Sequence, residues 1–274
     1  MSKFASFAEY PARSLNAAEA ALLTAWATLH RYHEDLVLVG GLAVKYLTKP
    51  GSELLPGPVT MDVDFGIALG AEGGQYGTIA DDLTGQGFKR DKNGRFVRLF
   101  ETMPLFVDFL TEHPKFNAGT THVDGVEAGV FPGVERALAT RRFVEVRGKD
   151  LFGAQQEARV PIAGIGALLV LKLNAFDDRQ QPKDAYDVLL ATTQFVGGAD
   201  AAVAAFHAER KAGNRGFARA AATLQRHFLN IDQSGPIRGA EFALEGGDAA
   251  DAADRRRQIQ ERMVTVGAAL AGGK

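Results

Sequence analysis

Three aspartates carry the most recognisable chemistry in this sequence. Asp62 and Asp64 lie two residues apart, and Asp108 follows within a later apolar segment. Carboxylate oxygens are preferred ligands of Mg²⁺, which usually keeps waters and substrate phosphates in its coordination shell. Two such ions about 3.5–4 Å apart can hold the attacking and leaving oxygens of an in-line displacement at phosphorus. These residue types therefore indicate magnesium-dependent phosphoryl chemistry.

The segments around the acids have the patterns of β-strands. Residues 59–69 alternate polar and apolar side chains, which places Asp62 and Asp64 on the same face of the predicted strand. Residues 105–110 form a second, apolar strand around Asp108. If these strands are neighbours, three carboxylates converge on one spot. Against this, an Asp-x-Asp pair on a strand is more often solvated surface, and a lone acid can simply mark a strand end.

A glycine pair precedes the acids. Residues 36–39 are a short apolar run typical of a buried strand; Gly40 and Gly41 end it, and residues 42–47 begin a helix. A glycine pair after a strand is more often than not only a turn. The order of strand, glycine pair, helix, paired acids and third acid is more informative than any one part.

In this order the segments resemble the polymerase-beta-like nucleotidyltransferase superfamily. The resemblance rests on residues 38–43 and 60–65. It implies that Gly40 and Gly41 approach the phosphates of a bound nucleotide. It also implies that three residues bind the metal and are catalytic: Asp62, Asp64 and Asp108. The second small residue is often serine in that superfamily, so with Gly41 a hydroxyl contact is missing and backbone N–H groups must serve.

Residues 171–187 are similar to the second half of the AbiEii-type nucleotidyltransferases, which belong to abortive-infection and toxin–antitoxin systems. In those proteins a lysine on a helix faces the triphosphate, and a Lys/Arg-Asp-x-x-Asp turn follows. Carried over, Lys172 and Asp184 become nucleotide-binding residues. The residues themselves agree for Lys172, which closes an apolar helical run and either snorkels or points into a polar cleft.

The pattern around Asp184 leaves two readings open. Pro182 suits the first turn of a new helix, so Asp184 can equally be an acid placed near the positive end of that helix. We interpret Asp187 as structural, paired with Arg179 or Lys183.

The arginines near the acids are weaker candidates for functional residues. Residues 88–90 and 95–100 form a predicted hairpin that carries Arg95 and Arg98. As a pair they could guide phosphates or an acceptor, but an exposed strand that carries arginines is commoner. A second basic cluster is interpreted as a solvated face: Arg141, Arg142 and Arg147.

The succession of strand and helix patterns predicts an α/β fold with two domains. The resemblance implies that residues 1–155 form the nucleotidyltransferase domain, with a mixed sheet and helices. Alanine- and leucine-rich stretches dominate after Pro161, so residues 156–274 are expected to form a helical domain.

Several other classes of protein are disfavoured. The 274 residues include no cysteine, which excludes disulfides and thiolate sites, and the six histidines lack zinc-site spacing. No P-loop sequence is present. A net charge of −2 gives no global attraction to nucleic acid. The first residues show no signal-peptide pattern and no apolar run is long enough for a membrane span, so we expect a soluble, cytoplasmic protein with no membrane partner.

The resemblance implies a magnesium-dependent enzyme that moves a nucleoside monophosphate from an NTP to an acceptor. It further implies a toxin role with a separate antitoxin protein, and RNA (tRNA included) or protein as the acceptor. Two alternatives stay open. One is a fold-alike without transfer activity that binds nucleotides or proteins, and the other is an aminoglycoside-type transferase that acts on a small molecule.

Overall fold

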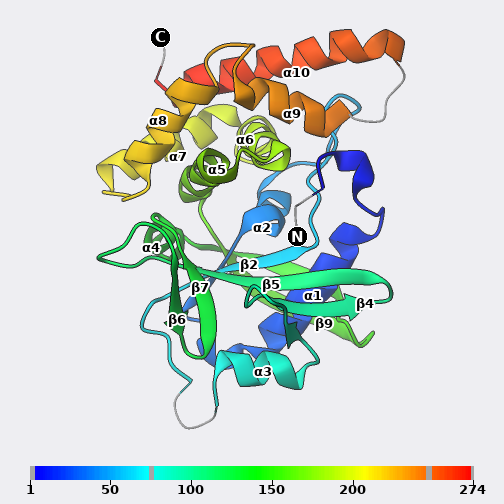
Figure 1. The fold of residues 1–274 in the computed structure, drawn as a ribbon, viewed down its shortest axis with the longest axis vertical. Helices are drawn as coiled ribbons and strands as arrows, with labels where there is room; N and C mark the ends of the chain where they lie inside the picture. Colours follow the sequence, from blue (N-terminus) through cyan, green and yellow to red (C-terminus); the bar gives the residue numbers. More distant parts are fainter. Residues whose placement is uncertain (1–3, 74–76, 245–248, 273–274) are drawn as a thin grey trace. The chain divides into compact units, whose positions relative to one another are not determined.

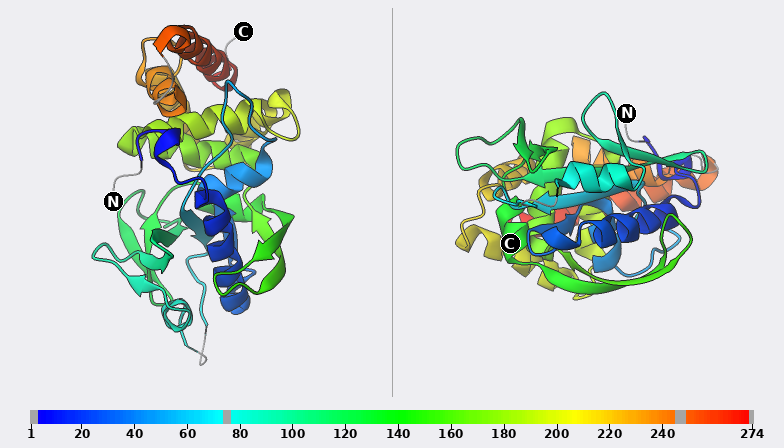
Figure 2. Two further views of the ribbon diagram at one scale, coloured as in Figure 1. Left: turned by 90° about the vertical axis from the view of Figure 1, so that its right-hand side faces the viewer. Right: turned by 90° about the horizontal axis from the view of Figure 1, so that it is seen from below.

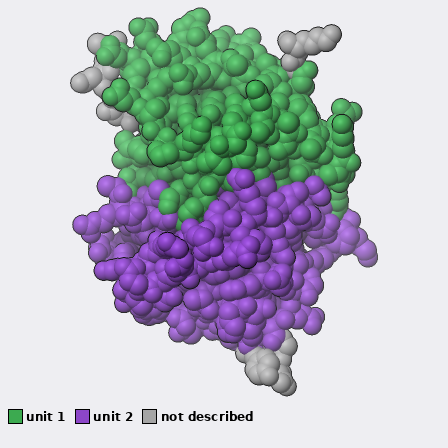
Figure 3. Space-filling model, turned by 180° about the vertical axis from the view of Figure 1, so that it is seen from behind, with its two compact units in different colours: residues 1–11, 44–59, 165–274 green, residues 12–43, 60–164 purple. Residues whose placement is uncertain are grey.

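The computed structural model describes residues 4–73, 77–244 and 249–272 of the chain. Figure 3 colours its two compact units. We call residues 12–43 and 60–164 the sheet unit, and residues 1–11, 44–59 and 165–274 the helical unit.

The division differs from the predicted boundary at residue 155. That residue begins β9 (Gln155–Ile162), which pairs along its whole length with β8 (Arg142–Lys149). Because antiparallel pairing ties the two strands together, the sheet unit continues to Gly164. The helical unit also includes residues 1–11 and 44–59. A single boundary along the chain cannot describe this division, because the chain passes between the two units more than once.

A mixed sheet forms the core of the sheet unit (Figure 1). Its strands before β8 and β9 are β1 (Leu36–Val39), β2 (Asp62–Ile67), β3 (Lys89–Arg90), β4 (Phe96–Phe100), β5 (Met103–Thr111), β6 (Thr120–Val123) and β7 (Val126–Val130). The order is β3-β4-β5-β2-β1-β9-β8, and β7 pairs with both β5 and β6. Parallel β2–β5 and β1–β9 pairs combine with antiparallel β1–β2 and β4–β5 pairs, which confirms the predicted α/β class with a mixed sheet.

Helices cover both faces of this sheet. Besides the short turn η2 (His30–Tyr32), the sheet unit contains α1 (Ser14–Thr28), α3 (Ile79–Gly85), α4 (Val134–Ala139) and the start of α2 (Gly40–Leu47). Helix α1 packs along β2, β5, β8 and β9 (Figure 2), where Trp26 lies against Phe65. Val134 of α4 lies over Gly66. Because neighbouring residues of a strand face opposite sides, the side chains of Asp62 and Asp64 leave β2 on the α4 face.

The helical unit is built around α5 (Ile165–Arg179) and α6 (Pro182–Thr193), which are buried along most of their length. The other elements are η1 (Phe7–Glu9), α7 (Ala199–Lys211), α8 (Phe217–His227), α9 (Ser234–Leu244) and α10 (Ala249–Leu270). Helices α7 and α8 pack on α5, whereas α9 packs on α6 and lies beside α10 (Figure 1). The long helical stretch predicted after Pro161 is therefore observed. Within the described residues, no helix combines the length and apolar character that crossing a bilayer requires.

Early segments of the chain are built into the helical unit. The Tyr186 hydroxyl donates a hydrogen bond to the Pro56 carbonyl oxygen, and Thr48 forms a β-bridge with Phe195. Edge-on aromatic contacts join Phe7 and Tyr10 of the first residues to a ring on α9 (Phe242). Full burial of one such ring stabilises a fold by roughly 1.5–3 kcal/mol. These contacts explain why residues 1–11 and 44–59 cluster with the helices from residue 165 onward.

Candidate functional site: an acid cluster on β2 and β5

The two acid-bearing strands are direct neighbours, which is the condition under which the sequence predicted that the three carboxylates converge. Strand β2 runs parallel to β5, and their register places Asp64 opposite Asp108. Asp62 and Asp64 alternate with buried Val63 and Phe65, so both carboxylates leave the α4 face of the sheet. In-register neighbours share a face, which brings Asp108 to the same place. The structure thus brings together the three predicted acids, which we call the acid cluster.

A guanidinium group binds the acid cluster directly. The Arg95 Nε donates to both Asp108 carboxylate oxygens, at 2.7 and 3.0 Å. The Arg95 Nη2 donates to the same Asp108 carboxylate and, at 3.2 Å, to Asp62 Oδ1. The Arg95 Cζ also lies 4.1 Å from the centre of the Phe106 ring. One side chain therefore joins the two strands through their acids.

Strand pairing explains the position of Arg95. The register of β4 on β5 sets Phe96 opposite Val107, so the preceding residue, Arg95, comes next to Asp108. The predicted hairpin around residues 91–94 is observed, with β3 and β4 paired. Arg98 points elsewhere: its Nη1 donates to the Gln86 carbonyl oxygen at 2.7 Å. The two arginines thus have different contacts, and sequence reasoning underestimated Arg95.

Burial and charge act together on the acid cluster. Burial raises the pKa of Asp108 to about 6, with the charges of Asp62 and Asp64 adding to the effect and Arg95 opposing it. Burial alone would lower the pKa of Arg95, but its hydrogen bonds to Asp108 and the charges of the three acids raise that pKa overall. The acid cluster consequently has a strong preference for a nearby cation.

Gly40 makes room for one of the acids. This first residue of α2 has a φ of +67°, in the left-handed region that favours glycine. A Cβ placed on it would stand 1.8 Å from Asp64 Oδ2. The carboxylate therefore packs directly on the glycine backbone. Gly41 follows as a buried residue in the first turn of α2.

The donor set of the acid cluster fits magnesium in its chemistry. Three carboxylates supply the hard oxygen ligands that this ion prefers. In the described part of the chain, however, no three acidic, histidine or cysteine side chains stand in an arrangement ready to hold one metal ion. Arg95 contacts Asp62 and Asp108, whose side chains are 14% and 22% exposed. Metal binding would therefore require these two carboxylates to exchange one cation for another.

Lys172 and Asp184 belong to the helical unit, where both are buried in a charged network. The Lys172 Nζ donates to Asp187 Oδ2 at 2.6 Å, and the Lys183 Nζ donates to the same oxygen at 2.7 Å. Burial would raise the pKa of Asp187, but the two ammonium groups lower it overall. The predicted pairing of Asp187 with Lys183 is thus observed, and the contact of Lys172 with a triphosphate stays a prediction.

Asp184 occupies the first turn of α6, after Pro182 at the start of the helix. Its carboxylate accepts two hydrogen bonds from Arg179, at 2.6 and 2.9 Å, and its side chain is fully buried. This is the helix-start placement that the sequence left open beside a nucleotide-binding role.

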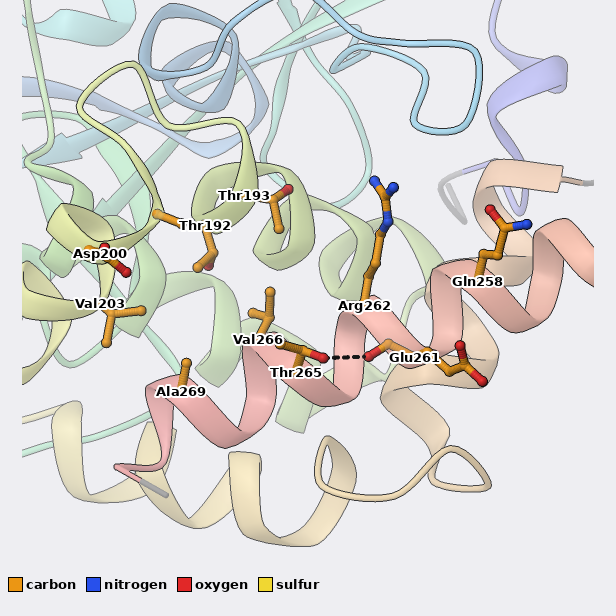
Figure 4. Close-up of a pocket in the computed structure, with 11 residues that line it drawn as sticks. Thr192, Thr193, Asp200, Val203, Gln258, Glu261, Arg262, Thr265, Val266 and Ala269 are labelled. Carbon is orange, nitrogen blue, oxygen red and sulfur yellow. Dashed lines mark hydrogen bonds between the residues drawn. The ribbon is translucent and has the colours of Figure 1, made fainter. Parts of the chain in front are cut away.

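A pocket of about 460 Å³ lies within the helical unit, between α6, α7 and α10 (Figure 4). Its walls combine charged residues such as Asp200 and Arg262 with the apolar Val203 and Val266. The Thr265 hydroxyl on its wall donates to the backbone of its own helix. None of the residues predicted from the sequence as functional lines this pocket.

A comparison with models of known families finds no match, and a comparison with curated proteins finds no significant match.

Proposed function

We propose that the protein is a magnesium-dependent nucleotidyltransferase that moves a nucleoside monophosphate from an NTP to an acceptor. The observation that carries this proposal is the convergence of Asp62, Asp64 and Asp108 on one face of two neighbouring strands. The order of strand, glycine pair, helix and acids along the chain supports it further. Resemblance to AbiEii-type proteins suggests a toxin with an RNA or protein acceptor and a protein antitoxin.

The acid cluster has defined tasks in this proposal. Asp62, Asp64 and Asp108 would hold magnesium, which supplies charge neutralisation and orients the reacting oxygens. Asp108, the acid of the second strand, would lie where it could accept the proton of the acceptor hydroxyl. The acceptor oxygen then forms a bond to the α-phosphorus while the bond to the β-phosphate breaks, and pyrophosphate leaves. Backbone N–H groups of Gly40 and Gly41 are placed at a helix start, where they favour phosphate.

One observation favours a second candidate function. Arg95 already neutralises Asp62 and Asp108, as a structural ion pair would in a protein that binds partners without catalysis. The alternative is therefore a nucleotidyltransferase-like module that has no transfer activity.

Calorimetric titration of each NTP tests the metal and nucleotide site on which the transferase proposal depends. We expect binding that requires magnesium in the unchanged protein, and its loss in Asp62→Ala/Asp64→Ala. The matched control is Glu145→Ala/Glu157→Ala, which removes two acids from exposed positions on β8 and β9 of the same unit. This control should bind as the unchanged protein does. Absence of NTP binding by well-folded unchanged protein would contradict the transferase proposal and favour the module.

A further inference from the structure

The acid cluster already contains a cation that belongs to the protein. Arg95 makes its side-chain hydrogen bonds to two acids on different strands, and the ring of Phe106 covers its guanidinium. Its side chain is only 24% exposed. Arginine–carboxylate contacts of this multiple kind are among the stronger hydrogen bonds in proteins, and they fix the geometry of both partners.

We propose that Arg95 is an internal competitor of the divalent metal ion. The guanidinium and the ion require the same oxygens of Asp62 and Asp108, so the ion binds only as Arg95 releases them. The inference rests on the proposed function, because it assumes that these acids are the metal ligands. It assigns to Arg95 a positioning role, since Arg95 holds the acids near one another while no ion is bound.

Electrostatics argues for exchange rather than joint occupancy. The guanidinium donates two hydrogen bonds to Asp108 Oδ2 and one each to Asp108 Oδ1 and Asp62 Oδ1, so it occupies acceptor sites that the ion would use. A divalent ion beside an engaged guanidinium would also repel it strongly in a partly buried site. The affinity for the metal ion is therefore set by the difference between the free energies with which the acid cluster binds the ion and the guanidinium. This affinity is weaker than three converging carboxylates alone would provide.

The test uses Mn²⁺ as a probe, with binding followed by calorimetry and by the loss of the free-ion EPR signal. Arg95→Gln should bind Mn²⁺ about tenfold more tightly than the unchanged protein, or better, since a tenfold change needs only about 1.4 kcal/mol. Arg98→Gln is the matched control, three residues further along in β4, because Arg98 contacts the Gln86 backbone and the Phe152 ring. It should bind Mn²⁺ as the unchanged protein does.

Two further variants keep the test decisive. In Arg95→Gln/Asp62→Asn/Asp64→Asn the gain should disappear, which assigns it to the acid cluster. If Arg95→Gln folds poorly without metal, Arg95→Lys retains the charge with fewer directed donors and should show a smaller gain. Equal or weaker Mn²⁺ binding in both folded Arg95 variants overturns the inference.

The outcomes separate this inference from the proposed function. Tighter Mn²⁺ binding by Arg95→Gln, with no magnesium-dependent NTP binding by any variant, supports the competition and removes the transferase proposal. Magnesium-dependent NTP binding by the unchanged protein, with unchanged Mn²⁺ affinity in Arg95→Gln, overturns the competition and leaves the transferase proposal in place.

Discussion

At the residue scale, the close contact between Gly40 and Asp64 shows how backbone geometry positions an acid. The carboxylate of Asp64 fills the space that any Cβ at residue 40 would take. The backbone there also has a positive φ, which disfavours every residue with a side chain. A side chain at residue 40 would therefore reduce the stability of the fold in two ways, through the clash with Asp64 and through the backbone conformation.

We therefore predict that Gly40→Ala destabilises the protein by more than backbone strain alone. The control is Gly213→Ala, because Gly213 has a similar φ of +72° but no heavy atom within 4 Å of its would-be Cβ. The control should cost about 1–2 kcal/mol from the left-handed conformation. Gly40→Ala should cost at least about 1 kcal/mol more, because the Asp64 carboxylate must move. Urea unfolding measures both, and equal costs would contradict the assigned clash.

Residue types and spacing were sufficient to predict the acids, but not the arginine. Period-two alternation placed Asp62 and Asp64 on one face, and the apolar context of Asp108 marked a second strand. The contact with Arg95 depends on the register of β4 on β5, which brings Phe96 opposite Val107. Nothing local in the sequence fixes that register, because the connecting turn can be formed with several offsets. The signal available was an arginine directly before an apolar strand.

At the element scale, α5 and α8 are joined by charges as well as by apolar packing. Asp177 near the end of α5 accepts hydrogen bonds from Arg219 at 2.8 Å and from Arg226 at 2.6 Å. Burial would raise the pKa of Asp177, but the two guanidinium groups lower it overall. Its side chain is 13% exposed, so solvent screens the pairs only in part.

This arrangement predicts a defined dependence of stability on pH. A carboxyl whose pKa is lower in the folded state stabilises the protein above its unfolded pKa, near the ordinary value of 3.8. That contribution is lost as the pH falls through the lower, folded pKa. Between pH 7 and pH 3, Asp177→Asn should therefore lose less stability than the unchanged protein in urea unfolding. Parallel stability curves for the two proteins would show that Asp177 does not contribute.

Element prediction worked best where the patterns were simple. The strands around residues 36–39, 62–67 and 103–111 and the helices after residue 161 follow from apolar runs and periodicity. The β8–β9 hairpin was not predicted, although residues 144–147 alternate, because its arginines were interpreted as a solvated cluster. Arg147 does lie on an exposed face, and it also pairs across the hairpin with Glu157, at 2.6 Å. Cross-strand pairing of this kind is invisible until the partner strand is known.

At the scale of the whole molecule, the chain enters the helical unit before it has completed the sheet unit. Contacts such as the Tyr186 hydroxyl with Pro56 connect residues 44–59 to helices that follow residue 165. A single domain boundary near residue 155, drawn from composition, could not describe this arrangement. Composition shows where residue types change along the chain, but not which segments pack together.

We predict that residues 165–274 expressed alone do not unfold cooperatively. They lack the two early segments of the helical unit, and with them the contacts of Phe242 and Phe195. The control is Tyr186→Phe in the full chain, which removes only one hydrogen bond and should cost about 1 kcal/mol while unfolding stays cooperative. Thermal unfolding followed by circular dichroism distinguishes them. A sharp transition of the isolated fragment would show that the early segments are dispensable.

The divided helical unit also sets an order of events on the ribosome. Residues 44–59 leave the ribosome early, yet the helices they pack against are made only after the sheet unit. The sheet unit has all its residues once Gly164 has emerged. At typical rates of synthesis, the remaining residues need on the order of ten seconds. During that interval the segment from residue 44 to 59 waits without its partners, which leaves it open to chaperones and proteases.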